Sequence, residues 1–197
     1  YLSRKDSSCL LMVGTGSLAP YMIRAHAAVR PVEQVLIWGR RRERARAIAE
    51  RLRNELDCEI DAVGEIEEGL RRADIISCAT LSPDPLVYGR FLRPGQHLDL
   101  VGSFKPDMRE ADDETVRRAS LYVDTREGAC RESGDIHIPL SKGIIEEKDV
   151  LADLFTLCRQ DRFARKSEEE ITLFKSVGYA LEDLVAARQA FEKFKSE

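Results

Sequence analysis

The chain has 197 residues, 43% hydrophobic and 34% charged, with 31 Lys and Arg against 35 Asp and Glu. This composition is typical of a globular domain, and without a basic excess nucleic acid is not the expected partner. No apolar run reaches the roughly 18 residues that span a bilayer, and the first residues do not resemble a signal peptide, so we expect a cytoplasmic protein with no membrane partner. The five cysteines lack CxxC spacing, and no histidine has ligand-spaced neighbours, so we expect neither disulfides nor a metal site.

Short apolar runs that end in turns alternate with helical stretches along the chain. The expected strands are 9–13, 34–38, 58–63, 74–80, 96–103, 120–125 and 170–174. Helices are expected between them, including 42–56, 111–119 and part of 149–160. This alternation predicts an α/β fold, a Rossmann-type doubly wound parallel sheet with helices on both faces.

The last helical stretch has an apolar stripe made of Val177, Leu181, Leu184 and Phe191. Such a stripe either packs into the core or covers a surface for another segment or a partner subunit. The pattern alone leaves both alternatives open.

A glycine-rich turn, Gly14-Thr15-Gly16-Ser17-Leu18-Ala19, follows the first expected strand and opens a helix. It matches the G-x-G-x-x-G/A pattern, which is weak alone and gains meaning from this strand-to-helix context. Gly14 allows the tight turn, Gly16 lets backbone N–H groups approach a pyrophosphate, and Ala19 allows close helix packing. We therefore predict a dinucleotide pyrophosphate at this helix N-terminus, with a glycine turn that binds no ligand as the alternative.

The end of the second expected strand predicts which dinucleotide is bound. Sites for NAD usually place Asp or Glu there to bind the ribose 2′-hydroxyl, whereas this chain has Trp38, Gly39, Arg40 and Arg41. Guanidinium groups match the charge and shape of a 2′-phosphate, so we predict NADP(H), with NAD(H) as the second candidate. The alternative is a solvated basic start of a helix, since arginines continue at Arg44.

Three stretches together resemble the ornithine cyclodeaminase/mu-crystallin family: LMVGTGSLAPYMIRAH, VGSFKPDMREADDETVRRASLYVDTREGACRESGDI and EITLFKSVGYALEDLVAA. The family includes alanine dehydrogenases and reductases of cyclic imines such as pyrroline-2-carboxylate. The resemblance implies a dinucleotide-binding domain inserted in a second domain that carries substrate binding and dimerisation, and hence a homodimer.

The resemblance also implies a division of this chain. Residues 1–8 are expected to be a linker from a missing N-terminal domain, 9–175 the NAD(P)-binding domain, and 176–197 a C-terminal helix that returns to the second domain. The family's substrate-carboxylate arginine and catalytic lysine would lie in the missing part, so no residue of this chain receives those roles.

Matching to the family implies further cofactor contacts. They lie after the fourth strand, at the end of the fifth strand on the nicotinamide side, and at a strand-to-helix step that offers a second helix N-terminus near Ser176. The complete set expected to bind the cofactor is Gly14, Thr15, Gly16, Ser17, Leu18, Ala19, Trp38, Gly39, Arg40, Arg41, Thr80, Leu81, Val101, Gly102, Ser103, Lys175, Ser176, Val177 and Gly178.

One departure from the family's pattern is informative. Ornithine cyclodeaminases place a catalytic Asp two residues after the glycine that corresponds to Gly102, and here that position is Phe104. Because phenylalanine cannot transfer a proton, the resemblance favours a reductase or dehydrogenase. Asp107 is a weak catalytic candidate, and beside Pro106 it is equally a turn residue.

The other polar candidates have structural interpretations. His26 is expected to be partly buried, His97 to precede a core strand and His137 to lie in a loop. Asp124 is expected at the crevice end of a strand, and Glu127 at the start of the next helix, where a carboxylate favours the helix dipole.

The leading hypothesis is an NADP-dependent oxidoreductase that transfers hydride to or from a small amino or imino acid, with a cyclic imine such as pyrroline-2-carboxylate favoured. One alternative is an ornithine cyclodeaminase, which forms proline and ammonia. The other is a non-catalytic NADP-dependent ligand-binding protein.

Overall fold

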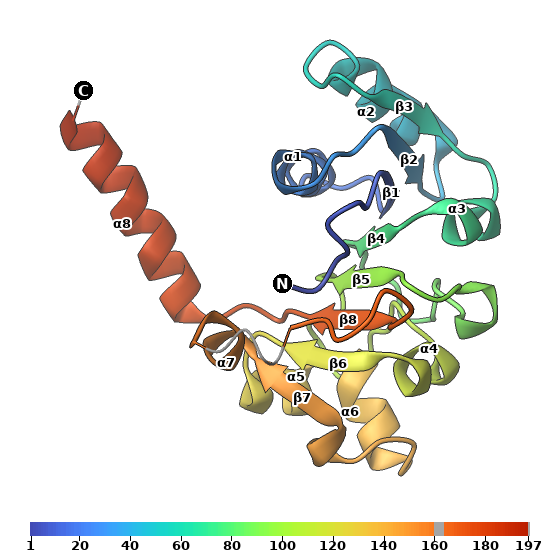
Figure 1. Cartoon of the computed structure of the whole chain (residues 1–197), viewed down its shortest axis with the longest axis vertical. Helices are drawn as coiled ribbons and strands as arrows, with labels where there is room; N and C mark the ends of the chain where they lie inside the picture. Colours follow the sequence, from blue (N-terminus) through green and yellow to red (C-terminus); the bar gives the residue numbers. More distant parts are fainter. Residues whose placement is uncertain (160–163, 197) are drawn as a thin grey trace.

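A computed structural model describes residues 1–159 and 164–196, and its centre is one parallel sheet (Figure 1). The eight strands follow the order β3-β2-β1-β4-β5-β8-β6-β7. Their bounds are β1 (Cys9–Val13), β2 (Gln34–Trp38), β3 (Glu59–Ala62), β4 (Ile75–Cys78), β5 (His97–Leu100), β6 (Ser120–Val123), β7 (Val150–Asp153) and β8 (Thr172–Lys175). Each neighbouring pair is parallel, which confirms the predicted Rossmann-type sheet.

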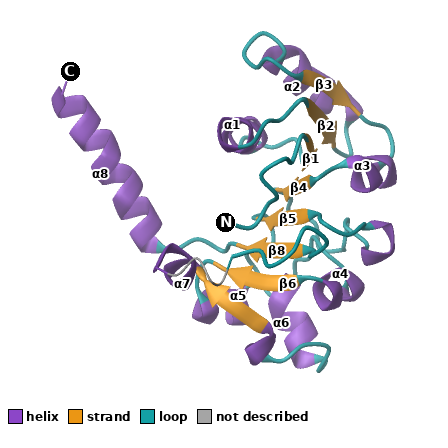
Figure 2. Cartoon of the chain, in the orientation of Figure 1, coloured by secondary structure: helices purple, strands orange, loops and turns teal. Residues whose placement is uncertain are grey.

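Helices flank the sheet on both faces, and Figure 2 shows them beside the stacked strands. They are α1 (Ala19–Val29), α2 (Arg42–Leu52), α3 (Ile66–Arg72), α4 (Asp113–Arg118), α5 (Arg126–Glu132), α6 (Gly134–Ser141), α7 (Leu154–Arg159) and α8 (Ala180–Ser196). Two short 3-10 helices lie at Gly89–Phe91 and Glu147–Asp149.

The apolar clusters show which helices cover which face. Leu11 and Val13 share a buried cluster with residues of α3, α4, α5 and α6, namely Leu70, Val116, Ala129 and Ile136. Leu10 and Met12 belong to a second cluster with Ile23 of α1 and with Ala45 and Leu52 of α2. Because β1 is buried on both faces, its sequence is a continuous apolar run instead of an alternating one.

The last strand occupies an internal position in the sheet. β8 pairs with both β5 and β6, and its final residue, Lys175, is registered with Leu100 on one side and Val123 on the other. The carboxyl ends of β5, β6 and β8 therefore meet at one place, although β8 is far from the other two in sequence.

The prediction of a partly helical segment at 149–160 was incomplete, because the segment begins with a strand. β7 alternates Val150 and Ala152, both buried, with less buried residues, and Asp153 then accepts a hydrogen bond from the Thr156 N–H at 2.8 Å as α7 begins. Four alternating residues are too few to distinguish from a helical turn by periodicity. Gln160 lies outside the described residues.

The prediction of a loop at His137 was wrong. The residue lies in α6, which begins earlier because the Ser133 hydroxyl accepts a hydrogen bond from the Asp135 N–H. Only Ser133 lies between α5 and α6. A break of one residue is too short for the sequence pattern to show where one helix ends and the next begins.

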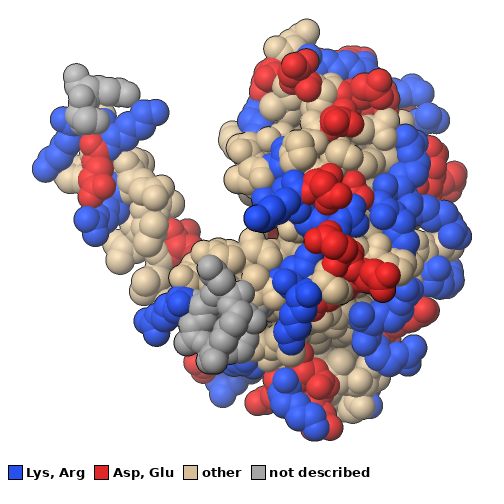
Figure 3. Space-filling view, in the orientation of Figure 1, with Lys and Arg blue, Asp and Glu red and all other residues tan. Residues whose placement is uncertain are grey.

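The C-terminal helix starts beside α7, and its remaining length stands clear of the rest of the chain in Figures 1 and 3. It begins at Ala180, so Val177 precedes it, and its apolar residues Leu181, Leu184 and Phe191 are exposed. The core-packing alternative for this stripe was therefore wrong. Among the helices that the structure describes, none has the length and apolar character needed to cross a membrane.

The first eight residues lie against the sheet. Leu2 is buried, and its carbonyl oxygen accepts hydrogen bonds from Arg165 Nε and from the Thr172 hydroxyl at the start of β8. The assignment of 1–8 as a linker remains a prediction about the relatives' second domain.

His97 gives the fold a pH-dependent stability. Burial lowers its pKa to about 3, and its Nδ1 lies 2.9 Å from the Thr172 hydroxyl. An unfolded histidine has a pKa near 6.5, so between these values the unfolded chain binds a proton that the folded chain does not. Stability therefore falls as the pH is lowered through this window.

We expect His97→Asn to flatten this dependence by about 1 kcal/mol per pH unit near pH 5. Urea unfolding at a series of pH values measures the slope. His137→Asn, at an exposed position, is the control and should retain the wild-type slope. Equal slopes in the His97 variant and the wild type would contradict the assignment.

Candidate functional site

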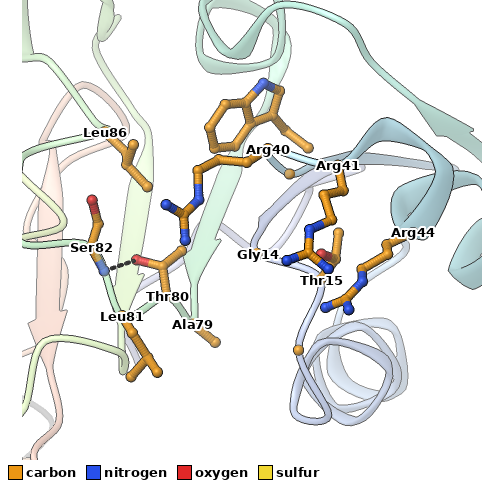
Figure 4. A pocket seen from close by; sticks show the side chains of 13 residues that line it. Gly14, Thr15, Arg40, Arg41, Arg44, Ala79, Thr80, Leu81, Ser82 and Leu86 are labelled. Carbon is orange, nitrogen blue, oxygen red and sulfur yellow. Dashed lines mark hydrogen bonds between the residues drawn. The ribbon is translucent and has the colours of Figure 1, made fainter.

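A cavity of about 270 Å³ opens where β1, β2 and β4 end (Figure 4). Because these strands are parallel and adjacent, the turns after them meet at one edge of the sheet. The residues that line the cavity are Gly14, Thr15, Gly16, Trp38, Gly39, Arg40, Arg41, Arg44, Ala79, Thr80, Leu81, Ser82 and Leu86.

The turn after β1 forms one wall. Gly14 has a φ of +120°, and a Cβ added there would lie 2.6 Å from the Ala79 carbonyl oxygen, so a side chain is excluded. A Cβ at Gly16 would have no atom within 4 Å, which leaves open space beside the exposed backbone. Ala19, the first residue of α1, is fully buried, as close packing of this helix requires.

The helix that follows this turn suits an anion. Its first turn carries no acidic residue, and Pro20 near its start has a φ that is already helical. The first N–H groups of a helix lack partners within the helix, and the dipole adds partial positive charge there.

Three arginines form the wall after β2. Figure 4 shows Arg40 reaching across the cavity toward the loop of Thr80 and Ser82, whereas Arg41 and Arg44 lie beside Thr15. These arginines surround the start of α2, the end of a helix where cations are disfavoured by the dipole. An anion bound among the three arginines would offset the repulsion between their positive charges and the positive end of the α2 dipole.

The third wall comes from the loop after β4. Thr80 and Leu81 line the cavity as the family match implies, and Ser82 and Leu86 continue the same wall. The Ser82 N–H donates to the Thr80 hydroxyl at 3.4 Å, which is drawn in Figure 4.

Sequence reasoning did not assign Arg44, Ala79, Ser82 and Leu86 to the site. Arg41 is the extended residue just before α2 and Arg44 lies in the first turn of that helix, so the run of arginines after Gly39 was the available signal. The position of the loop that carries Ser82 and Leu86 depends on tertiary contacts that no local pattern records.

Several expected cofactor residues do not line this cavity: Ser17, Leu18, Ala19, Val101, Gly102, Ser103, Lys175, Ser176, Val177 and Gly178. Ser17 and Leu18 are exposed beside the turn, whereas Gly102 and Ser103 are buried. The Ser103 hydroxyl donates to the Met108 carbonyl oxygen, so its hydrogen-bonding role in the structure is internal.

The side chain of Lys175 points into the protein. Its side chain is fully buried, and its Nζ lies 3.5 Å from Asp135 Oδ2. Low dielectric makes a lone buried charge costly, so this ion pair explains why a lysine is tolerated at the end of β8.

The expected helix N-terminus at Ser176 is not present, because α8 begins at Ala180. Here the buried carboxylate of Asp124 accepts hydrogen bonds from the N–H groups of Val177 and Gly178 at 2.7 and 2.8 Å. Asp124 directly follows the end of β6, as expected, and its carboxylate anchors this segment there.

The remaining candidates have structural positions. Asp107 is exposed in a turn closed by the Met108 N–H and the Lys105 carbonyl, and Phe104 is 44% exposed nearby. His26 Nε2 lies 3.1 Å from Asp99 Oδ2, which ties α1 to β5.

Glu127 lies in the first turn of α5, as predicted, and pairs with Arg131 at 2.8 Å. The helix is capped by the Thr125 hydroxyl, which accepts from the Gly128 N–H. Within the described residues, no group of three or more His, Cys, Asp or Glu side chains is placed to hold a metal ion.

Comparison with known proteins gives consistent matches over the chain. A model of the ornithine cyclodeaminase/mu-crystallin family matches residues 1–197. A Paracoccus denitrificans protein named Delta(1)-pyrroline-2-carboxylate reductase is 42% identical over 187 residues, covering 94% of this chain and 59% of that protein.

Solved structures agree with this match. A Thermococcus litoralis Delta(1)-pyrroline-2-carboxylate reductase in complex with NADH and L-proline superposes with a TM-score of 0.95 at 39% identity, over 98% of this chain and 60% of that one. An archaeal alanine dehydrogenase dimer with bound NAD gives a TM-score of 0.92 at 29% identity, over 100% and 60%. The chain thus spans about 60% of the length of these relatives.

Proposed function

Because the chain belongs to the ornithine cyclodeaminase/mu-crystallin family, we propose that it binds NADP(H) and serves the reduction of a small cyclic imine of the pyrroline-2-carboxylate class. The observation that carries the proposal is the cavity itself. Its described lining joins a glycine turn and three arginines and contains no carboxylate.

The residues present fit a dinucleotide phosphate. The turn from Gly14 to Gly16 offers backbone N–H groups and open space, which suits a pyrophosphate. Arg40, Arg41 and Arg44 lie where the adenosine ribose of a Rossmann-type site is bound, and their charge suits a 2′-phosphate. When bound, the nicotinamide supplies the hydride chemistry, while the protein holds it in place and excludes water.

The substrate and assembly belong to the same proposal. Relatives in complex with L-proline or named as pyrroline-2-carboxylate reductases support a small imino acid as substrate. The archaeal relative described as a dimer, and the exposed apolar residues of α8, support a homodimer. Phe104 in place of a proton-transferring carboxylate supports a reductase over a cyclodeaminase.

The cofactor preference is tested by titrating NADPH and NADH while the fluorescence of Trp38 is followed. Trp38 is the single tryptophan of the chain and lines the cavity, so its emission reports binding there. We expect the double variant Arg40→Ala and Arg41→Ala to raise the Kd for NADPH by about 10- to 100-fold, since charge-assisted contacts to the phosphate are lost. The Kd for NADH should change far less.

Arg46→Ala is the matched control, because Arg46 is an exposed arginine of α2 outside the cavity lining. Its NADPH affinity should equal that of the wild type. A wild type that binds NADH as tightly as NADPH, with no effect of the double variant, would refute the NADP(H) preference.

Turnover distinguishes the activities. Steady oxidation of NADPH with pyrroline-2-carboxylate is expected from the protein that carries this chain. Formation of proline and ammonia from ornithine without net cofactor consumption would assign a cyclodeaminase instead, and cofactor binding without either reaction would assign a ligand-binding protein.

A further inference from the structure

A buried carboxylate joins the loops that follow β4 and β5. Glu110 is fully buried, and its Oε1 accepts hydrogen bonds from the Thr80 N–H at 2.7 Å and the Thr80 hydroxyl at 2.9 Å. Its Oε2 accepts from the Gly102 N–H at 2.8 Å. The two oxygens thus hold the ends of two neighbouring strands to one side chain.

The backbone approach at this point is close. A Cβ added to Gly102 would overlap the backbone of Thr80 and the carboxylate of Glu110, so only glycine allows the two loops to be this near. Thr80 in turn lies beside the turn from Gly14 to Gly16. Its Cγ2 is 3.3 Å from the position that a Cβ on Gly14 would take. Glu110 is thereby linked through Thr80 to the wall of the cavity.

A second layer holds Glu110 in place. The Asp135 carboxylate, from α6, accepts hydrogen bonds from the N–H groups of Glu110 and Ala111 at 2.8 and 2.9 Å. Lys175 of β8 pairs with that carboxylate from the other side. These contacts fix both the backbone and the charge around Glu110.

We propose that Glu110 is a positioning residue of the cofactor site, whose carboxylate sets the distance between the β4 and β5 loops and so the place of Thr80 and Leu81 in the cavity wall. This inference rests on the proposed function, because it assumes that the cavity binds the dinucleotide. Glu110 itself does not line the cavity.

The charge of Glu110 is needed for this role. Burial raises its pKa above the ordinary value, and the charged groups that face it are Lys175 from β8, which lowers the pKa, and Asp135 from α6, which raises it. The Cys78 thiol of β4 is a further titratable group near it, since the charge of Glu110 contributes to raising the pKa of that thiol. When Glu110 takes up a proton, one oxygen becomes a donor, and the weaker acceptor that remains loosens its hydrogen bonds from Gly102 or Thr80.

The test compares Glu110→Gln with the wild type. Glutamine keeps one carbonyl oxygen but puts an NH₂ where the second acceptor was, so one half of the link is lost. We expect the Kd for NADPH to rise about 10-fold. Glu114→Gln, at a half-buried Glu four positions later that lies 3.8 Å from Arg118 and outside the cavity lining, is the control and should bind as the wild type does.

The pH profile separates positioning from a general loss of stability. The affinity of the wild type for NADPH should fall as the pH is lowered toward the pKa of Glu110. The Glu110→Gln variant should not show this part of the fall in affinity, because glutamine does not titrate. The difference between the two profiles cancels the titration of the 2′-phosphate and of every other shared group.

Amide hydrogen exchange in the unliganded wild type gives a measurement that needs no variant. Protection of Thr80 and Gly102, relative to intrinsic exchange rates, should decrease together as the pH is lowered. A Glu110→Gln protein with wild-type affinity and a parallel pH profile would overturn the inference alone. A wild type that binds neither NADPH nor NADH would overturn the proposed function and the inference with it.

Discussion

Gly16→Val is expected to weaken the binding of NADPH and NADH by at least about 100-fold while leaving the free energy of unfolding near the wild-type value. The physical reason is the open space at this position, since no protein atom lies within 4 Å of an added Cβ. The Cβ of a valine therefore meets no neighbour in the free protein. It fills the volume through which a pyrophosphate would approach the backbone of the turn.

Gly14→Ala provides the contrast. At that position φ is +120°, and the added methyl group would lie 2.6 Å from the Ala79 carbonyl oxygen. We expect loss of stability by about 1–3 kcal/mol, because backbone strain and overlap are introduced before any ligand binds. Fluorescence titration and urea unfolding on both variants separate binding from folding. Gly16→Val binding NADPH with wild-type affinity would contradict a pyrophosphate at this turn.

The second large effect is expected at the buried ion pair of Lys175 and Asp135. Lys175→Met should destabilise the fold by about 3–5 kcal/mol, because it leaves the carboxylates of Asp135 and Glu110 buried without a cation. For a chain of this size the corresponding fall in Tm is about 10 °C. Thermal and urea unfolding measure both quantities.

The pH dependence of this loss has a definite sign. Burial already raises the pKa of Glu110, and removing Lys175 removes the charge that lowers it. The variant can therefore relieve the uncompensated charge by protonation, so its deficit should shrink as the pH is lowered. Combining Lys175→Met with Asp135→Asn should recover part of the stability, since Asn keeps an oxygen that accepts from Glu110 and Ala111.

Lys142→Met is the control for this prediction. Lys142 pairs with Asp113 at 3.2 Å, but its side chain is 53% exposed, so its loss should cost less than about 1 kcal/mol. Equal stability of the Lys175 and Lys142 variants would contradict a larger contribution of the buried pair to the free energy of unfolding.

The NADP(H) preference, by contrast, depends on residues that the sequence shows directly. Arg40 and Arg41 follow a strand whose end is marked by Gly39, and the position where a carboxylate would bind a ribose hydroxyl holds none. The identity of these side chains predicts their chemistry because they are exposed and line the cavity.

Local patterns determined most of the α/β architecture. The glycine turn, the apolar runs of β1, β2, β4 and β5, and the amphipathic α2 were all predicted, because strand and helix periodicity and turn residues act over a few positions. β7 was missed because four alternating residues do not separate a strand from a helical turn.

The tertiary structure alone decided what the buried charges do. The sheet order places β8 between β5 and β6, and this brings Lys175, Asp135 and Glu110 together from distant parts of the chain. A sequence shows that a residue is charged but not which opposite charge will neutralise it in a low-dielectric interior. For this reason the pairing of Lys175 with Asp135, and the role of Glu110 in joining the β4 and β5 loops, were recognisable only in the folded chain.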